Sequence, residues 1–207
     1  MAESEGSSKS FEMVCGVLIA VFAAVLAITD LGAGKYGDDE LIAHNEKGEA
    51  YLWYQSKGIK ETLVEGQRDT LQALVAADAI RPEQRPAVDA LVHKLDAKVQ
   101  RYGKEKKEIL LGSSAVGEAN WVQDVNGVMG KITGANQWQV RADALNDVGD
   151  TFDYSTFFLQ LCLVFGAISL VIQRDGIQRT FFWIMNGLGV IGMAVSIYAF
   201  HLASQVP

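Results

Sequence analysis

Three stretches of this chain lack Asp, Glu, Lys, Arg and His, and each is long enough to cross a lipid bilayer. They run from Met13 to Thr29, from Tyr154 to Gln173 and from Thr180 to Phe200. An α-helix rises ~1.5 Å per residue, so roughly 20 residues span the hydrocarbon layer. We therefore expect an all-α membrane protein with three transmembrane helices and a long, coiled-coil-like extramembrane helical hairpin.

The charges divide the chain into an apolar anchor and a water-soluble body. Residues 30–153 hold 36 of the 43 charged residues, with 15 Lys and Arg against 21 Asp and Glu. This acidic body lacks the basic face that neutralises phosphates, so we exclude nucleic acid as a partner. The two cysteines, Cys15 and Cys162, lie in the apolar stretches and are interpreted as packing residues.

The predicted organisation follows from this division. The segments are a tail (1–12), a first transmembrane helix (13–32), an extramembrane domain (33–153), a second transmembrane helix (154–173), a short basic loop (174–179), a third transmembrane helix (180–201) and a C-terminal tail (202–207). The extramembrane domain comprises a hairpin over 39–111, a glycine-rich insertion over 112–137 and a helix over 138–153 that runs into the second span. The first apolar stretch also fits a signal peptide, but the acidic residues before it favour a retained helix.

Orientation is predicted from the short loop between the last two spans. Arg174 and Arg179 lie in this loop, and basic residues of short loops stay on the cytoplasmic side. We therefore expect the N-terminus in the cytoplasm, and the helical domain and Pro207 on the opposite side.

An apolar doublet recurs every 11 residues at the start of the body. Eleven residues in three turns is close to the natural helical period, so the repeat predicts one apolar stripe along a helix of roughly 40 residues. We expect this helix to begin near Asp38 or Asp39 and to end before Pro82. Such a stripe needs a partner in water. The doublets are Leu41-Ile42, Leu52-Trp53, Leu63-Val64 and Leu74-Val75.

A seven-residue repeat follows the proline-containing connection. The short connection predicts an antiparallel helical hairpin. Because the two repeats differ in period, we hypothesise that the first helix also contacts another subunit. Interleaved basic and acidic residues indicate a solvated face, with an anionic-lipid or acidic-partner patch as the alternative. The repeat comprises Val88, Leu95, Tyr102 and Ile109.

The glycine-rich insertion interrupts both patterns. The spacing of Val122, Val125, Met129 and Ile132 predicts a short helix within it. Segments of this length are packed or mobile connectors, or they dock a partner. Trp121 is the candidate contact residue in the second case.

One motif in the third span imitates a dinucleotide-binding fingerprint. Residues 187–192 read Gly-Leu-Gly-Val-Ile-Gly, but the fingerprint requires a strand-to-helix turn and an acidic residue about 20 positions later. Neither fits an uncharged span near the end of this sequence. We therefore interpret Gly187, Gly189 and Gly192 as small residues at a helix–helix contact.

Other chemistry has little support in the sequence. Gln160 and Asn186 are amides within the spans, and we expect interhelical hydrogen bonds from them, with pore or ligand contacts as the alternative. The spacings of zinc sites, di-iron bundles, phosphate loops and nucleophile elbows are missing. We therefore predict no cofactor, no metal ion and no catalytic residue, and we do not expect an enzyme.

Three segments resemble a family of small bacterial membrane proteins described as domain of unknown function 4337. The resemblance covers most of the chain and implies one N-terminal span, a charged helical middle and two C-terminal spans in the bacterial inner membrane. It implies no activity. The chain departs from the family pattern at Tyr51, Ser56 and the glycine-rich insertion. The segments are Tyr51-Leu52-Trp53-Tyr54-Gln55-Ser56-Lys57-Gly58-Ile59-Lys60-Glu61, Arg101-Tyr102-Gly103-Lys104-Glu105-Lys106-Lys107-Glu108-Ile109 and Phe152-Asp153-Tyr154.

Two functions remain as expectations. The first is a non-catalytic structural, scaffolding or accessory subunit, with membrane lipids and either its own copies or a larger membrane complex as partners. The alternative is a homo-oligomeric channel or small-solute conduit. The candidate packing and partner contacts are Leu41, Leu52, Trp53, Tyr54, Lys57, Ile59, Leu63, Leu74, Trp121, Gly187, Gly189 and Gly192.

Overall fold

The computed structural model describes residues 2–172 and 174–206, and side chains within 10–172, at 174 and within 176–206. The predicted end points Met1, Gln173 and Pro207 lie outside the described residues. The main helices are α1 (Ala2–Ala76), α2 (Arg85–Leu111), α4 (Ala135–Val171) and α5 (Asp175–Ala203). Between α2 and α4 lie α3 (Ser113–Val116), the 3₁₀ helix η1 (Glu118–Asn120), β1 (Asp124–Val125) and β2 (Val128–Met129). The predicted all-α class is confirmed.

Three of these helices, α1, α4 and α5, are long and apolar enough to cross a membrane. This agrees with the three apolar stretches and is compatible with a membrane location. The chain forms two compact units, one from residues 1–41 and 141–207 and the other from 42–140. The first unit therefore contains the apolar stretches, and the second contains most of the predicted hairpin.

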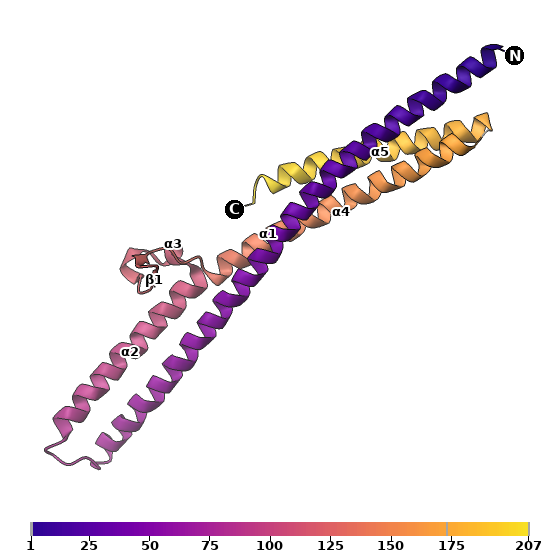
Figure 1. Ribbon diagram of the computed structural model, residues 1–207. Coiled ribbons are helices and arrows are strands. Elements are labelled where there is room, and N and C mark those ends of the chain that lie inside the picture. The colour runs from indigo at the N-terminus through magenta and orange to yellow at the C-terminus, as the bar shows by residue number, and fades with distance from the viewer. Residues whose placement is uncertain (1, 173, 207) are drawn as a thin grey trace. The chain divides into compact units, whose positions relative to one another are not determined.

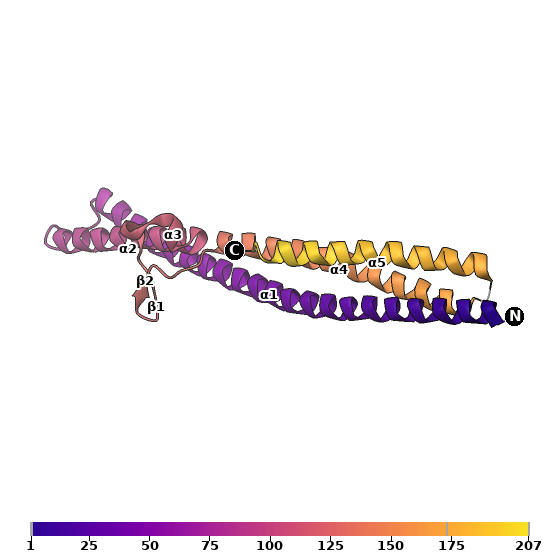
Figure 2. The ribbon, with the colours of Figure 1, turned by 90° about the horizontal axis from the view of Figure 1, so that it is seen from above.

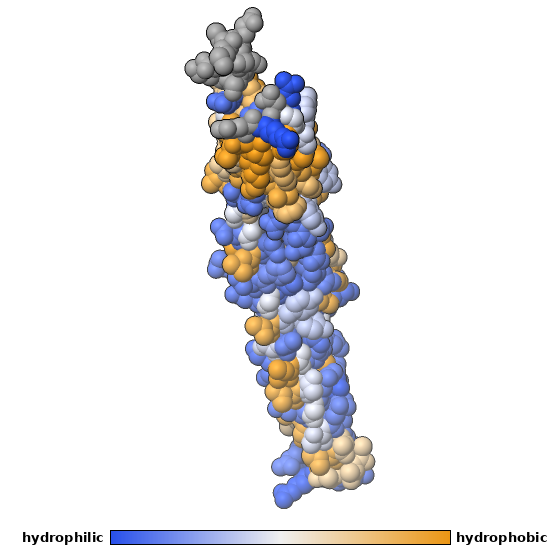
Figure 3. Space-filling view, turned by 90° about the vertical axis from the view of Figure 1, so that its right-hand side faces the viewer, coloured by the Kyte–Doolittle hydropathy of each residue, from blue (hydrophilic) through white to orange (hydrophobic). Residues whose placement is uncertain are grey.

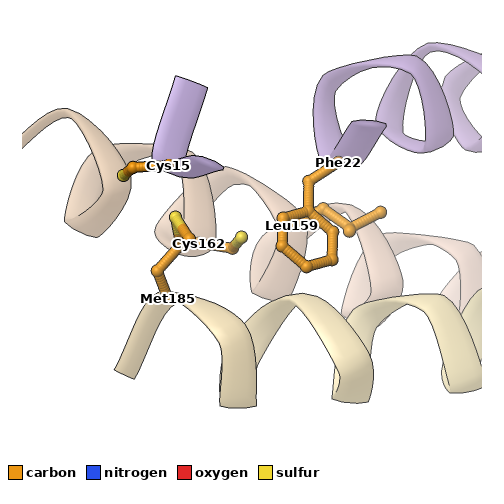
Figure 4. Packing of buried hydrophobic residues seen from close by; sticks show 5 residues of the cluster. All are labelled: Cys15, Phe22, Leu159, Cys162 and Met185. Carbon is orange, nitrogen blue, oxygen red and sulfur yellow. The ribbon is translucent and has the colours of Figure 1, made fainter. Parts of the chain in front are cut away.

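The core of the first unit lies between its three helices. Cys15 and Phe22 from α1 meet Leu159 and Cys162 from α4 and Met185 from α5, as Figure 4 shows. All five are buried. Both cysteines are free and packed in apolar surroundings, as the sequence predicts.

Hydroxyl groups also join these helices. Thr29 Oγ1 lies 2.8 Å from Ser196 Oγ, linking α1 to α5. Ser155 Oγ donates to the Gly192 carbonyl at 2.9 Å, linking α4 to α5. These short side chains hold helices close because a hydroxyl reaches a neighbouring backbone with little intervening volume.

Helix α1 continues without a break from the apolar stretch into the body, so the predicted helix start at Asp38 or Asp39 is wrong. The glycines in this region do not end the helix; Gly32 instead gives room to two rings. A Cβ at Gly32 would lie 2.8 Å from Phe200 Cζ and 3.0 Å from Phe152 Cε1. Close packing therefore explains a glycine inside the helix.

Helix α1 ends six positions before Pro82, through a Schellman motif. Asp78 has φ 52°, the Ala79 N–H donates to the Leu74 carbonyl at 3.1 Å and the Asp78 N–H to the Val75 carbonyl at 3.2 Å. The left-handed residue after the helix satisfies the last carbonyls, so the proline is not needed to stop it. In Figure 1, α2 lies beside the C-terminal part of α1.

The predicted short helix over 122–132 is wrong. Val125 pairs with Val128 and Asp124 with Met129 in a two-stranded antiparallel ribbon, which projects below α3 in the view of Figure 2. Asn126 and Gly127 form its turn with φ 53° and 79°. Asn-Gly is the usual sequence of a tight hairpin turn, because both residues tolerate positive φ. That local signal is stronger than the weak helical spacing of the apolar residues.

Two other predicted boundaries change. The basic loop over 174–179 is shorter than predicted, because α5 begins at Asp175 and the Gln178 N–H already donates to the Arg174 carbonyl at 2.9 Å. The helix predicted over 138–153 begins earlier, at Ala135, and continues as α4 into the second span.

Candidate interaction surface on α1

The last two apolar doublets each combine an exposed leucine with a half-buried valine, whereas Leu41 and Ile42 are both exposed. Leu52 is 66% exposed and Leu63 is 62% exposed, whereas Val64 and Val75 are half-buried. Ile59 is 64% exposed. We call Leu52, Ile59, Leu63 and Leu74, all in the second unit, the α1 stripe. Leu41 continues the same series in the first unit and is also exposed.

Ion pairs fix the side of α1 that meets α2. Lys57 Nζ pairs with Glu105, which also accepts a hydrogen bond from Arg101 Nε at 2.8 Å. Lys106 Nζ lies 2.7 Å from Glu61 Oε2. The Glu105 carboxylate is almost completely buried, so its two cationic partners offset the cost of removing its charge from water.

Further contacts extend this side of α1. Arg68 Nη1 donates to Asp96 Oδ1 at 3.1 Å. The Lys106 ammonium lies 5.2 Å from the centroid of the Tyr54 ring. The hydrogen bond to the Glu61 carboxylate raises the pKa of Lys106, because it favours the charged ammonium. Tyr54 and Lys57, both predicted contact residues, therefore face α2 within this chain.

The α1 stripe lies on the other side of the helix. With about 100° of rotation per residue, Leu52, Ile59 and Leu63 lie within about 40° of one another. By the same geometry, the mean direction of the three ion-pair residues Lys57, Glu61 and Arg68 is about 160° away from the stripe. The stripe therefore points away from α2, and the hairpin contact does not cover it.

The surface around the α1 stripe is neutral and contains small residues. From residue 45 to residue 74, no charged side chain lies within about 50° of the centre of the stripe. Gly48 and Gly66 lie on this side, and a Cβ at either would meet nothing within 4 Å. A glycine inside an exposed helix costs about 1 kcal/mol relative to alanine. No packing within the described chain accounts for these two.

Two shallow hollows adjoin the stripe at successive levels of α1. One is lined by Leu63, Gly66, Thr70, Leu91 and other residues of α1 and α2, and a second by Gln55, Gly58, Ile59, Thr62 and Leu63. Leu63 belongs to both. The surface at the stripe therefore alternates projecting leucines with hollows, a shape that suits packing against another helix. Figure 3 shows hydrophobic surface gathered in patches on the face that it displays.

Trp53 does not share a face with Ile59, contrary to the predicted stripe. It lines a hollow with Ala50, Val125, Ile132 and Trp138. The rotation of about 120° between positions 53 and 59 accounts for the difference. Trp53 thus faces the segment that precedes α4.

Trp121 holds the glycine-rich segment together. Its Nε1 donates to the Ser113 carbonyl at 2.8 Å. A Cβ at Gly130 would lie 2.6 Å from Trp121 Cη2, so only glycine permits this close approach. Trp121 is half-buried, and its indole is engaged within the segment.

Glu108 anchors the same segment, and the sequence analysis did not single it out. Its fully buried carboxylate accepts hydrogen bonds from Ser113 Oγ at 2.8 Å, Val122 N at 3.0 Å and Gln123 N at 3.2 Å. Ser113 Oγ in turn accepts a hydrogen bond from Ile132 N at 3.0 Å. The segment is a packed connector built on α2. The sequence did contain a signal for this anchor. Glu108 precedes the apolar run Ile109-Leu110-Leu111, and two serines, Ser113 and Ser114, follow shortly after it.

The three glycines of the false fingerprint have different neighbours. A Cβ at Gly189 would overlap the Phe22 ring, and one at Gly192 would lie 2.7 Å from Leu159 Cγ. Gly187 has nothing within 4 Å of such a Cβ. The structure therefore brings Gly189 and Gly192 into the core of the first unit and places Gly187 at its surface.

The two amides in the spans make no described interhelical bond. Asn186 Nδ2 donates to the Phe182 carbonyl of its own helix at 2.8 Å, and Gln160 is exposed. Hydroxyl side chains make interhelical bonds instead, among them those of Thr29, Ser155 and Ser169. Among the described residues, no three His, Cys, Asp or Glu side chains come together as a metal site.

Comparisons with known proteins give one match. A family model described as Domain of unknown function (DUF4337) matches residues 11–202. No curated protein and no solved structure matches the sequence. The match covers most of the chain and confirms the family resemblance.

Proposed function

We propose that this chain, which belongs to the DUF4337 family, is a non-catalytic multi-pass membrane protein that acts as a structural, scaffolding or accessory subunit of a membrane assembly. The observation that carries the proposal is the exposed, neutral α1 stripe. Its side chains Leu52, Ile59 and Leu63 are each more than 60% exposed. A partner that covers them would remove this apolar surface from water.

The membrane anchor supports this role. Helices α1, α4 and α5 each have the length and hydropathy of a span, and their apolar stretches contain no Asp, Glu, Lys or Arg. We place the protein in the bacterial inner membrane with the N-terminus in the cytoplasm. Arg174 and Arg179 near the short connection favour this orientation, which puts the helical domain on the extracytoplasmic side.

The antiparallel hairpin of α1 and α2 is the second part of the proposal. Three ion pairs support it, Lys57–Glu105, Glu61–Lys106 and Arg68–Asp96. The pair furthest along α1, at Arg68, reaches the earliest of the three positions on α2, Asp96. In this arrangement α2 stiffens α1 from one side and leaves the stripe available. The hairpin acts as a stalk that presents the stripe to a partner.

The test is the mass of the assembly in native membranes. The protein is extracted into native nanodiscs, and its complexes are weighed by native mass spectrometry. We expect an assembly heavier than one chain, and loss of that assembly on Ile59→Glu with Leu63→Glu. The control, Gln72→Glu, adds a charge to an exposed position of α1 about 140° or more from both substituted residues. A lone chain in the wild type would overturn the proposal.

A homo-oligomeric channel or small-solute conduit is the second candidate. Gln160 favours it, since this exposed amide lies within the apolar stretch of α4. A polar side chain inside a membrane usually faces other helices or a water-filled path. Conductance or solute flux in reconstituted vesicles, lost on Gln160→Leu, is the expected result for a channel, and impermeable vesicles would exclude it.

A further inference from the structure

We propose that the occupant of the α1 stripe is the same stripe of a second copy of this chain, packed parallel and in register. This inference rests on the proposed function and names the partner. It requires three properties of the surface. The two stripes must run in the same direction, their identical surfaces must pack together without charge repulsion, and they must stay in contact along their length.

A shared membrane supplies the direction. Copies inserted with one topology are related by rotation about an axis normal to the bilayer, so the components of equivalent helices along that normal point the same way. Equal positions of two copies also lie at equal heights above the membrane. Leu63 of one copy therefore lies at the same height as Leu63 of the other.

The chemistry of the stripe tolerates self-contact. A charged surface would repel its own copy, but this one is neutral. Between positions 48 and 74, the residues within about 50° of the centre of the stripe are uncharged and exposed. The nearest charged residues, Glu49 and Lys60, lie at its edge, about 60° and 80° from the centre. Self-contact along the centre therefore brings together no like charges and buries no unpaired ion. The central residues are Gly48, Leu52, Ser56, Ile59, Leu63, Gly66, Thr70 and Leu74.

The shape of the stripe also suits self-contact. Gly48 and Gly66 have open space above them, and in a parallel pair each meets its own equivalent. Small residues at the same level on both helices let the backbones approach closely. Between these levels, Leu52, Ile59 and Leu63 supply the apolar side chains. Close packing between two copies therefore explains Gly48 and Gly66, which no contact within the described chain explains.

The period of the repeat keeps two copies in contact. A stripe that repeats every 11 residues drifts only about 20° per repeat around a straight helix, so a parallel pair stays together with slight supercoiling. From Leu52 to Leu74 the contact would be about 33 Å long. A seven-residue repeat is the better match for a left-handed pair, and α2 carries that repeat on the side that faces α1.

The experiment is disulfide cross-linking in native membranes. Single cysteines replace Ile59 or Leu63 in a Cys15→Ala, Cys162→Ala background, and copper phenanthroline is the oxidant. We expect a product of twice the chain mass from Ile59→Cys and from Leu63→Cys, and at least tenfold less from Gln72→Cys. If the background does not fold, the native chain serves, because both of its cysteines are fully buried.

The register is tested with two differently tagged chains. Ile59→Cys in one and Leu74→Cys in the other lie about 22 Å apart along a parallel, in-register pair. We expect the 59–59 and 74–74 products and little of the mixed product. A mixed product as abundant as the others would overturn the parallel register. Equal cross-linking of Gln72→Cys would overturn the stripe as the contact surface.

A second label separates this inference from the proposed function. Benzophenone maleimide is attached to Leu63→Cys and irradiated in native membranes. An adduct of twice the chain mass supports the second copy. An adduct with a different protein would overturn the second copy while supporting a scaffolding or accessory role. If the labelled Leu63→Cys chain gives no adduct and native mass spectrometry of the wild type shows a lone chain, both the inference and the proposed function are overturned.

Discussion

Gly189 of α5 packs directly against the ring of Phe22 of α1. A Cβ at Gly189 would overlap three ring atoms of Phe22, and Phe22 is itself buried in the core of the first unit. The glycine therefore sets how closely α1 and α5 approach. Gly187, one half-turn earlier in α5, has no such neighbour.

These two glycines give a matched pair of substitutions. Gly189→Ala should destabilise the first unit by about 1–3 kcal/mol, because the buried Phe22 ring must move to make room. Gly187→Ala should leave stability unchanged or raise it by up to about 1 kcal/mol, since alanine favours the helix. The measurement is unfolding in mixed detergent micelles followed by circular dichroism. Equal effects of the two substitutions would refute the packing assigned to Gly189.

A second prediction concerns the hydroxyl pair between α1 and α5. Thr29→Val keeps the shape of the side chain but removes the group that lies 2.8 Å from Ser196 Oγ. We expect a loss of about 1 kcal/mol, the usual scale of an interhelical hydrogen bond in a membrane protein. Thr180→Val is the control, because the exposed Thr180 hydroxyl donates within its own helix, to the Gly176 carbonyl at 3.0 Å. Thr29→Val and Thr180→Val with the same unfolding midpoint would argue against the assignment.

A third prediction concerns the anchor of the glycine-rich segment. Glu108→Ala removes the acceptor of two backbone N–H groups and one hydroxyl. We expect a loss of about 3 kcal/mol, since buried donors left without a partner carry a desolvation cost. Limited proteolysis should then cut within residues 112–134 while α2 and α4 persist. Glu118→Ala, at an exposed position, should leave the cleavage pattern of the wild type, and faster cleavage in this control would make the Glu108 result uninformative about the anchor.

A fourth prediction concerns pH. The hydrogen bond to Glu61 raises the pKa of Lys106. Its contribution to folding is therefore complete below the pKa of an unfolded lysine, about 10.4, and is lost as pH rises through the higher folded pKa. We expect Lys106→Gln to be less stable than wild type by about 0.5–1 kcal/mol at pH 8, the scale of a partly buried ion pair near the surface.

The difference should shrink above about pH 10.4. Unfolding by urea across pH 8–11 measures it, with Lys104→Gln as an exposed control on α2. A gap between wild type and Lys106→Gln that stays constant over this range would show that the ion pair is not its cause.

The elements with strong local signals were predictable. Residues 13–29, 154–173 and 180–200 had no charges, and helices cover all of their described residues except Ile172, because a long uncharged run has few other stable conformations. The ends were less predictable. Asp78 ends α1 through a left-handed conformation that glycine adopts more often. In the glycine-rich segment, the Asn126-Gly127 turn signal and the helical spacing of the apolar residues predicted different structures, and the local sequence did not show which of the two would form.

The candidate surface was predictable in part. The 11-residue repeat identified Leu52, Leu63 and Leu74, but it treated each doublet as one stripe. The structure separates Leu63 from Val64 and Leu74 from Val75, because α2 approaches from the side of Lys57 and Glu61. A repeat reports which residues share a face of a helix and carries no information about which face a neighbour will cover.

The sequence by itself determined that the chain is helical, that three stretches suit a membrane and that α1 carries a continuous apolar series. These properties depend on the period and charge of neighbouring residues. Only the tertiary structure decided that Gly189 and Gly192 are packed while Gly187 is open, that Glu108 carries the connector, and that Leu63 stays exposed beside the half-buried Val64. Those outcomes depend on atoms brought together from distant positions, and local periodicity does not encode that proximity.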